Sequence, residues 1–241
     1  MGKQKEKRIL EVTNLTGYAN KIKLFSDISF YLGVGESLVL YGPRGSGKSA
    51  LLRTFVRLNE EVYDNVRYEG NVFLDGNDLF AINIKDLRNL VFYVDTNFLE
   101  ALDYLRFDEL LSLGLGESVD FEIEENAETL DDFGILKALR NGEKTRLSEF
   151  YILEKIELLL YLAYLKNSFL VIFDCIFDHL DDEHLQHISR TVKKKLLSEN
   201  RSLIIATRFL KRFMPLSDLF IFMKNGKIKY KGEPKDFANV R

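Results

Sequence analysis

Short apolar runs alternate with stretches of helical periodicity along this chain. Four of the runs are apolar almost throughout, which is typical of strands buried on both faces, and they cover 37–41, 90–94, 169–173 and 202–207. Between them, segments such as 50–56 and 182–197 repeat apolar residues at helical spacing. Because parallel strands need crossover connections, usually helices, this alternation predicts an α/β fold with a mostly parallel sheet and flanking helices.

A second kind of strand pattern occurs near both ends of the chain. Residues 9–15 and 28–32 predict a small β-rich layer ahead of the buried strands. The segment 70–76 alternates and ends in Asp75-Gly76, and the last two runs, 219–223 and 227–231, meet at Asn225-Gly226. Asp-Gly and Asn-Gly are strong hairpin signals. An antiparallel β layer should therefore accompany the parallel sheet.

The middle of the chain is helical and acidic. Within 97–166, the run 123–128 is either a solvated helix face or a loose linker. A helix is expected from about Ser148 to Leu165, apolar on more than one face. We expect a single domain over 1–241, with 97–166 as an inserted α-helical subdomain.

Composition limits the binding partners and the cellular location that we expect for this domain. The net charge of -3 gives no drive toward nucleic acid or anionic membrane, and the single cysteine indicates a reducing, intracellular setting. Residues 1–8 are Lys-rich rather than apolar, unlike a signal peptide; they predict a disordered tail or a basic arm that touches lipid headgroups. The longest apolar stretch, 158–165, is too short to span a bilayer. We predict a cytoplasmic protein.

One glycine-rich stretch carries a chemical signal. Gly42-Pro43-Arg44-Gly45-Ser46-Gly47-Lys48-Ser49 fits G-x-x-x-x-G-K-[ST], with a predicted strand before it and a predicted helix from Ala50 after it. Backbone N–H groups of such a loop form a nest for phosphate, reinforced by the N-terminus of the following helix. Lys48 would reach the terminal phosphates, and Ser49 would hold Mg²⁺. The alternative, a plain glycine turn, does not explain the full spacing.

With these motifs, residues 10–238 resemble the nucleotide-binding domain of an ABC transporter. The resemblance implies a P-loop NTPase core that binds ATP and Mg²⁺, with Tyr18 stacked on the adenine. Residues 169–174 resemble the family's Walker B strand, so that Asp174 would hold the metal together with Ser49. Residues 52–60 and 69–76 look more closely like the ATP-binding subunit of phosphate importers.

Several positions depart from the family pattern. Cys175 stands where the family has the glutamate that polarises the attacking water, and losing such a base typically costs about 10²–10⁴ in rate. An ordinary thiol is mostly protonated at neutral pH, so we interpret Cys175 as a small buried residue without a catalytic role. Thr96 occupies the place of a glutamine that contacts Mg²⁺, and Arg208 that of a histidine that contacts the γ-phosphate. Arg208 is either a phosphate ligand or a solvent-facing charge.

The signature loop departs as well. It should read LSGGQ, but the chain has Leu147-Ser148-Glu149-Phe150-Tyr151. Glu149 would place a like charge near the γ-phosphate of a partner, and Phe150 would add bulk to the loop. His179 lies in the D-loop position, where it is either a substitute base or a dimer-facing side chain. In a sandwich of two such domains, homodimeric or heterodimeric, neither composite site would be whole.

The resemblance and these departures together predict an ATP-binding subunit of an importer, phosphate-importer-like, with weak or lost hydrolysis. Its partners would be membrane permease subunits and a second ABC domain, at the inner face of the cell membrane. A regulatory nucleotide-binding module outside transport is the alternative, and an ATPase using another base is a third. The discriminating feature is an apolar groove around 97–105, where Phe98, Leu99 and Leu102 suit a permease helix.

Overall fold

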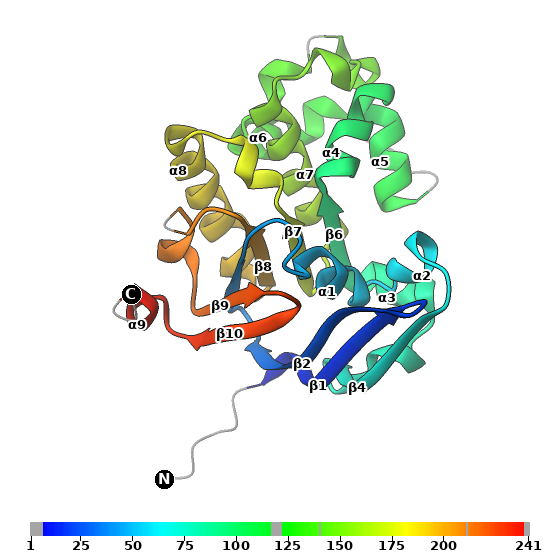
Figure 1. The fold of residues 1–241 in the computed structure, drawn as a ribbon. Coiled ribbons are helices and arrows are strands. Elements are labelled where there is room, and N and C mark those ends of the chain that lie inside the picture. Colours follow the sequence, from blue (N-terminus) through cyan, green and yellow to red (C-terminus); the bar gives the residue numbers. More distant parts are fainter. Residues whose placement is uncertain (1–6, 117–121, 140, 211, 239–241) are drawn as a thin grey trace.

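The computed structural model describes residues 7–116, 122–139, 141–210 and 212–238. Among these residues the strands form two sheets, one of six strands and one of four (Figure 1). The predicted disordered tail or basic arm at 1–8 lies almost entirely outside the described residues. No helix in the described part of the chain is long and apolar enough to cross a membrane.

The six-stranded sheet has the order β10-β9-β3-β8-β7-β6. Neighbours from β9 to β6 run parallel, and only β10 is antiparallel to its neighbour β9. The predicted mixed α/β architecture is therefore confirmed. The strand bounds are β3 Ser37–Tyr41, β6 Val91–Asp95, β7 Leu170–Asp174, β8 Ser202–Thr207, β9 Leu219–Lys224 and β10 Lys227–Gly232.

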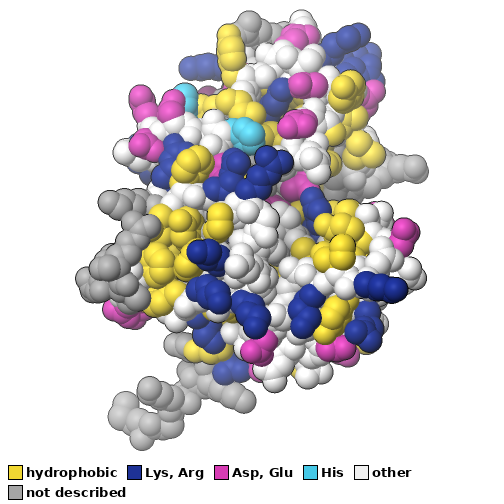
Figure 2. Space-filling model, in the orientation of Figure 1, with side chains coloured by type: hydrophobic (Ala, Val, Ile, Leu, Met, Phe, Trp, Pro, Cys, Tyr) yellow, Lys and Arg dark blue, Asp and Glu magenta, His cyan; other side chains and the backbone are white. Residues whose placement is uncertain are grey.

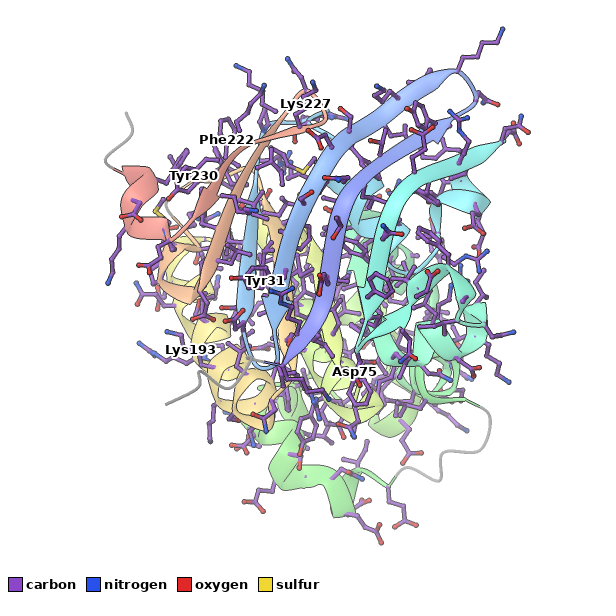
Figure 3. The ribbon with its side chains drawn as sticks, turned by 90° about the horizontal axis from the view of Figure 1, so that it is seen from below. Tyr31, Asp75, Lys193, Phe222, Lys227 and Tyr230 are labelled. Atoms are coloured by element: carbon purple, nitrogen blue, oxygen red, sulfur yellow. The ribbon has the colours of Figure 1, made fainter. Side chains whose placement is uncertain are left out.

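The second sheet is the predicted antiparallel layer, with the order β2-β1-β4-β5. Its strands are β1 Arg8–Ala19, β2 Ile22–Gly33, β4 Val66–Leu74 and β5 Asn77–Asp78. β1 and β2 are longer than predicted because they pair with each other as a hairpin, through several register shifts. Figure 3 shows this layer from below, with the β9–β10 hairpin beside β2, and the amide of Ser26 donates to the carbonyl of Gly226 at 2.8 Å.

Helices lie in the longer connections between strands and after β10. They are α1 Lys48–Thr54, α2 Asn59–Val62, α3 Ile84–Leu90, α4 Thr96–Ala101, α5 Phe107–Leu115, α6 Ile123–Asp132, α7 Ile152–Lys166, α8 Asp182–Thr191 and α9 Pro234–Ala238. Single 3₁₀ turns cover Leu79–Ala81, Leu102–Tyr104, Leu136–Ala138, Gly142–Lys144, Leu147–Glu149, Ile176–His179, Leu197–Glu199 and Met214–Leu216, and a π turn Val192–Leu196 follows α8.

Two of the predicted helices differ from those observed. The helix predicted from Ser148 begins only at Ile152, since Ser148 lies in a 3₁₀ turn and the carboxylate of Glu154 accepts the N–H of Tyr151 at 2.7 Å. The run 182–197 is α-helical only to Thr191. The acidic segment 123–128 lies on α6, so the helix-face interpretation is the right one of the two.

The six-stranded sheet separates two hydrophobic cores. Val39, Phe173 and Ile205 pack into the core that α4 to α8 cover, while their neighbours Leu40, Ile172 and Ala206 pack into the core beneath the antiparallel layer. This alternation follows from the two-residue period of a strand, and it explains why the central positions of these strands are apolar on both faces. In Figure 1, α4 to α7 gather beyond β6 and β7. The bounds 97–166 for a subdomain stay a prediction.

Candidate functional site

The loop between β3 and α1 has the backbone that its glycines predict. Gly45 and Gly47 have φ of +76° and +97°, a conformation that L side chains rarely adopt. Glycine is required at position 42 for a different reason: a Cβ there would lie 2.4 Å from the carbonyl oxygen of Met223. The three glycines therefore permit a turn that no other residues would make without strain.

Lys48 lies across this loop. Its Nζ donates to the carbonyl oxygen of Gly42 at 2.6 Å and to that of Pro43 at 3.2 Å, and the residue is 5% exposed. Burial lowers the pKa of Lys48, against the opposing effects of Cys175, Asp174 and Asp178. A phosphate oxygen is a stronger acceptor for an ammonium group than a carbonyl, so an entering phosphate has a donor already in place.

A pocket of about 580 Å³ opens beside the loop. Cationic side chains outnumber acidic ones on its wall, five to three, which suits a polyphosphate. Lys and Arg side chains also gather across the middle of the face shown in Figure 2. The wall is formed by Lys23, Leu24, Arg44, Gly45, Ser46, Gly47, Lys48, Ser49, Ala50, Arg53, Tyr63, Asp95, Thr96, Glu100, Asp174, Cys175, His179 and Arg208.

The structure brings most of the predicted site residues to this wall. It holds the predicted loop residues from Arg44 to Ala50, together with Thr96, Asp174, Cys175 and Arg208, although these come from four separate places in the sequence. Gly42 and Pro43 lie just behind the wall, where they accept from Lys48. The roles predicted for these side chains stay proposals.

Tyr18 does not belong to the wall. It lies in β1 rather than in a loop, its hydroxyl donates to Glu69 at 3.2 Å, and the Arg67 guanidinium lies 4.6 Å from its ring centroid. The ammonium of Lys23, which does line the pocket, lies 5.6 Å from the same centroid. Tyr18 thus lies on a strand next to a residue of the pocket wall, and its stacking on adenine stays a prediction. The tyrosine on the wall is Tyr63, at the end of α2, and no motif marks it in the sequence.

A Mg²⁺ ion would fit between α1 and the end of β7. Asp174 is 2% exposed; its Oδ2 accepts from Tyr93, and its Oδ1 is buried with no hydrogen-bond partner in the described residues. Such a free carboxylate oxygen suits a hard cation that is also held by Ser49, phosphate and water. The described residues contain no group of three or more His, Cys, Asp or Glu side chains that could hold a metal ion by themselves.

Cys175 follows β7 with a φ of 62°, in the left-handed region. Burial raises the pKa of its thiol to about 12, and the carboxylates of Asp174 and Asp178 add to the effect. At neutral pH the thiol is therefore protonated, and it cannot accept a proton from water.

Arg208 is held by the D-loop rather than left free. Its Nε and its backbone N–H both donate to Oδ2 of Asp178, at 2.9 and 3.1 Å, while Thr207 Oγ1 donates to Oδ1 at 2.6 Å. The Asp178 side chain is 0% exposed and the Arg208 side chain 44%. The structure thus adds a third account of Arg208, an ion pair within the chain.

The signature loop forms a 3₁₀ turn before α7. Ser148 and Glu149 are exposed, as the predicted like charge requires, but Phe150 is 5% exposed and belongs to the hydrophobic core. The expectation that Phe150 adds bulk to the loop surface is therefore wrong, because the side chain turns inward. Tyr151, which is 73% exposed, is the large side chain on that surface.

Sequence reasoning missed a polar group that joins the loop helix to β6. Nη2 of Arg53 on α1 lies 2.9 Å from Oδ2 of Asp95, whose Oδ1 accepts the N–H of Phe98 at 3.1 Å and so caps α4. α4 consequently starts at Thr96, directly at the pocket. The signal available in the sequence was the Asp-Thr pair at a strand end, which is typical of a helix cap.

Comparisons with known proteins agree with this geometry. A mitochondrial iron–sulfur clusters transporter, ATM1 of Debaryomyces hansenii, is 28% identical over 233 residues, covering 92% of this chain and 32% of that protein. The β-(1→2)glucan export ATP-binding/permease protein NdvA of Agrobacterium fabrum is 28% identical over 222 residues, covering 90% and 36%. The chain thus spans about a third of the length of these relatives.

A solved structure and a family model complete the comparison. The structure of cbiO1 from Clostridium perfringens, part of the ABC transporter complex cbiONQ, superimposes with a TM-score of 0.76 at 18% identity, over 97% of this chain and 92% of that one, which shows a shared fold. The family model described as ABC transporter matches residues 25–174, which include the glycine loop and Asp174. This chain therefore belongs to the ABC transporter family.

Proposed function

We propose that this chain is an ATP-binding subunit or domain of an ABC transporter, which binds Mg-ATP and hydrolyses it weakly or not at all. One observation carries the proposal: a single pocket is lined by the glycine loop, Lys48, Ser49 and Asp174, and one carboxylate oxygen of Asp174 has no hydrogen-bond partner in the described residues. These groups supply phosphate donors and metal ligands in the arrangement that Mg-ATP needs.

Weak hydrolysis is supported by the two side chains that stand in place of the family's glutamate and histidine. The thiol of Cys175 has its pKa raised to about 12, and the Arg208 side chain is paired with Asp178. His179 and Glu100 line the pocket and are exposed, so they are the remaining candidates for a base there. Binding without rapid turnover is what this set of side chains supports.

An apolar groove supports a transporter role over a regulatory module. A cavity of about 260 Å³ lies between β6, α4, α5 and α7, and its wall is mostly apolar, with Phe98 and Leu113 exposed. Leu99 and Leu102, also predicted for this groove, are 3% and 0% exposed and do not line it. A groove of this kind suits an amphipathic helix of a permease.

The proposed partners are membrane permease subunits or domains and a second ABC domain, identical or different, with this chain at the cytoplasmic face of the membrane. Phosphate import rests only on the resemblance of 52–60 and 69–76, whereas the relatives named above are an iron–sulfur cluster transporter and a glucan exporter. We therefore keep phosphate as a prediction about cargo, separate from the proposal. Uptake of labelled phosphate by cells with and without this chain would test it.

Nucleotide titration beside an ATPase assay tests the proposal. The chain should bind a fluorescent ATP analogue in the presence of Mg²⁺, Lys48→Ala should abolish that binding, and turnover should be far below that of an intact ABC ATPase. Absence of nucleotide binding by the unchanged chain would refute the binding role. Turnover in the ordinary ABC range, lost in Lys48→Ala, would refute weak hydrolysis.

The groove needs a separate experiment. Leu113→Glu should abolish association with a multispanning membrane protein in detergent extracts, while leaving ATP binding intact. Ile22→Glu is the matched control, because Ile22 on β2 is 69% exposed and Leu113 is 70% exposed. If both variants behave alike, the groove is not the docking site.

A further inference from the structure

Tyr93 joins two carboxylates at the edge of the pocket. It is the third residue of β6, which runs parallel to β7 so that Asp95 lies opposite Asp174. The Tyr93 hydroxyl lies 3.1 Å from Oδ2 of Asp174 and 3.3 Å from Oδ2 of Asp95. The sequence did not indicate this contact, because the partners are 81 residues apart.

The hydroxyl has one proton, and the other contacts indicate where it goes. Oδ2 of Asp95 already accepts from Nη2 of Arg53 at 2.9 Å, and its Oδ1 accepts from the amide of Phe98 at 3.1 Å. Asp174 is buried at the end of β7, and its Oδ1 has no partner in the described residues. Both oxygens of Asp95 thus accept hydrogen bonds from other donors. The Tyr93 hydroxyl is therefore expected to donate its hydrogen bond to Oδ2 of Asp174.

This hydrogen bond fixes Oδ2 of Asp174 through a residue that does not line the pocket. The other oxygen, Oδ1, is buried with no hydrogen-bond partner in the described residues, and Asp174 lines the pocket together with Lys48 and Ser49. A carboxylate fixed in this way presents a single oxygen toward a cation and does not turn away when the pocket fills. Outer partners of metal-holding carboxylates act by this kind of orientation.

We propose that Tyr93 is a positioning residue that orients Asp174 for Mg²⁺ bound with the nucleotide. The inference rests on the proposed binding of Mg-ATP. Arg53 and Asp95 contribute by keeping the second carboxylate satisfied, so that it does not compete for the tyrosine proton. Tyr93 itself touches neither nucleotide nor metal in this scheme.

The test is the Mg²⁺ dependence of nucleotide binding, measured by titrating Mg²⁺ into the chain with a fluorescent ATP analogue. Tyr93→Phe should raise the Mg²⁺ concentration for half-maximal effect about 10-fold or more, in line with other outer-partner losses. The affinity for the analogue in EDTA should change less than about twofold, since the glycine loop and Lys48 are untouched. Tyr93→Leu, a second variant without the hydroxyl, should behave in the same way.

Two controls separate positioning from a structural effect. Tyr68→Phe removes another hydrogen-bonded tyrosine hydroxyl, which accepts from Asn59 at 3.2 Å. Tyr68 lies on β4 in the four-stranded sheet, whereas Asp174 ends β7 in the six-stranded sheet, so this variant should not alter the Mg²⁺ response. In an Asp174→Asn background, Tyr93→Phe should add no further loss, because there is no carboxylate left to orient.

The outcomes are distinguishable. An unchanged Mg²⁺ response in both Tyr93 variants, with nucleotide binding intact, would overturn the role of Tyr93 alone. The role of Tyr93 would also be overturned if Tyr93→Phe weakened the Mg²⁺ response equally in the Asp174→Asn background, since the effect would then not depend on Asp174. Failure of the unchanged chain to bind nucleotide in EDTA and in Mg²⁺ would instead reject the proposed function.

Discussion

The imidazole Nε2 of His187 lies 2.9 Å from Oε1 of Glu157, and this contact joins α8 to α7. The Glu157 side chain is 4% exposed, whereas that of His187 is 48% exposed. Burial, with a smaller effect of the Glu154 carboxylate, raises the pKa of Glu157 from 4.5 to about 7. The helix that follows the signature loop therefore contains a carboxyl group that titrates close to neutral pH.

Stability should depend on pH through Glu157. The pKa of Glu157 is higher in the folded chain than in the unfolded one. Its contribution to the free energy of unfolding is therefore fully present below about pH 4.5 and is lost as the pH rises through about 7. The loss is on the order of 3 kcal/mol, at about 1.36 kcal/mol per pKa unit. In urea denaturation, Glu157→Gln should flatten the pH dependence of the free energy of unfolding. Glu154→Gln should leave most of it, and an unchanged dependence in Glu157→Gln would contradict the raised pKa.

Replacing Cys175 by glutamate should increase ATP turnover. The protonated thiol lines the pocket next to Asp174, where a carboxylate could accept a proton from water. A well-placed base contributes about 10²–10⁴ in rate, so a gain of about 10-fold or more is expected even if the fit is imperfect. Cys175→Gln has the same shape without the base and should show no gain. Equal rates for the two variants would place the block elsewhere, with Glu149 as the first candidate.

Arg208→Ala should weaken ATP binding far less than Lys48→Ala. The Arg208 guanidinium is paired with Asp178, and its removal leaves two donors on that carboxylate, from Thr207 and the Arg208 amide. We expect a change in Kd below about 10-fold, less than a full charge-assisted phosphate contact would give. Isothermal titration calorimetry would measure it. A loss as large as that of Lys48→Ala would mean that Arg208 leaves Asp178 for phosphate.

Asp95→Ala should destabilise the fold by about 3 kcal/mol, because it leaves the Arg53 charge unpaired and removes the cap of α4. The two side chains are only 15% and 11% exposed, so water compensates little. Chemical denaturation would measure the effect.

Asp181→Ala provides the comparison for Asp95→Ala. Asp181 caps α8 from an exposed position, so its removal should destabilise the fold clearly less than Asp95→Ala does. The double variant Arg53→Met with Asp95→Asn should be more stable than Asp95→Ala, since no buried charge is left unpaired. Asp95→Asn also retains a cap for α4, so the reverse order of stability would contradict the cost assigned to the unpaired Arg53 charge.

The sequence by itself determined the features that depend on neighbouring residues. The glycine loop, the buried strands and the Asn225-Gly226 turn follow from backbone sterics and from the two-residue period of strands, so they could be predicted within a residue or two. The family resemblance then predicted which distant residues meet at the pocket, and Asp174, Cys175 and Arg208 do line it.

Only the tertiary structure decided how these side chains are held. Phe150 turns into the core, Tyr18 lies in a strand behind Lys23, and Arg208 pairs with Asp178. Tyr93 reaches Asp174 because β6 lies beside β7, an adjacency that no local pattern specifies. Whether a polar side chain faces the pocket or a neighbour depends on which acceptors the packed strands place within about 3 Å, and that is set by the assembled sheet.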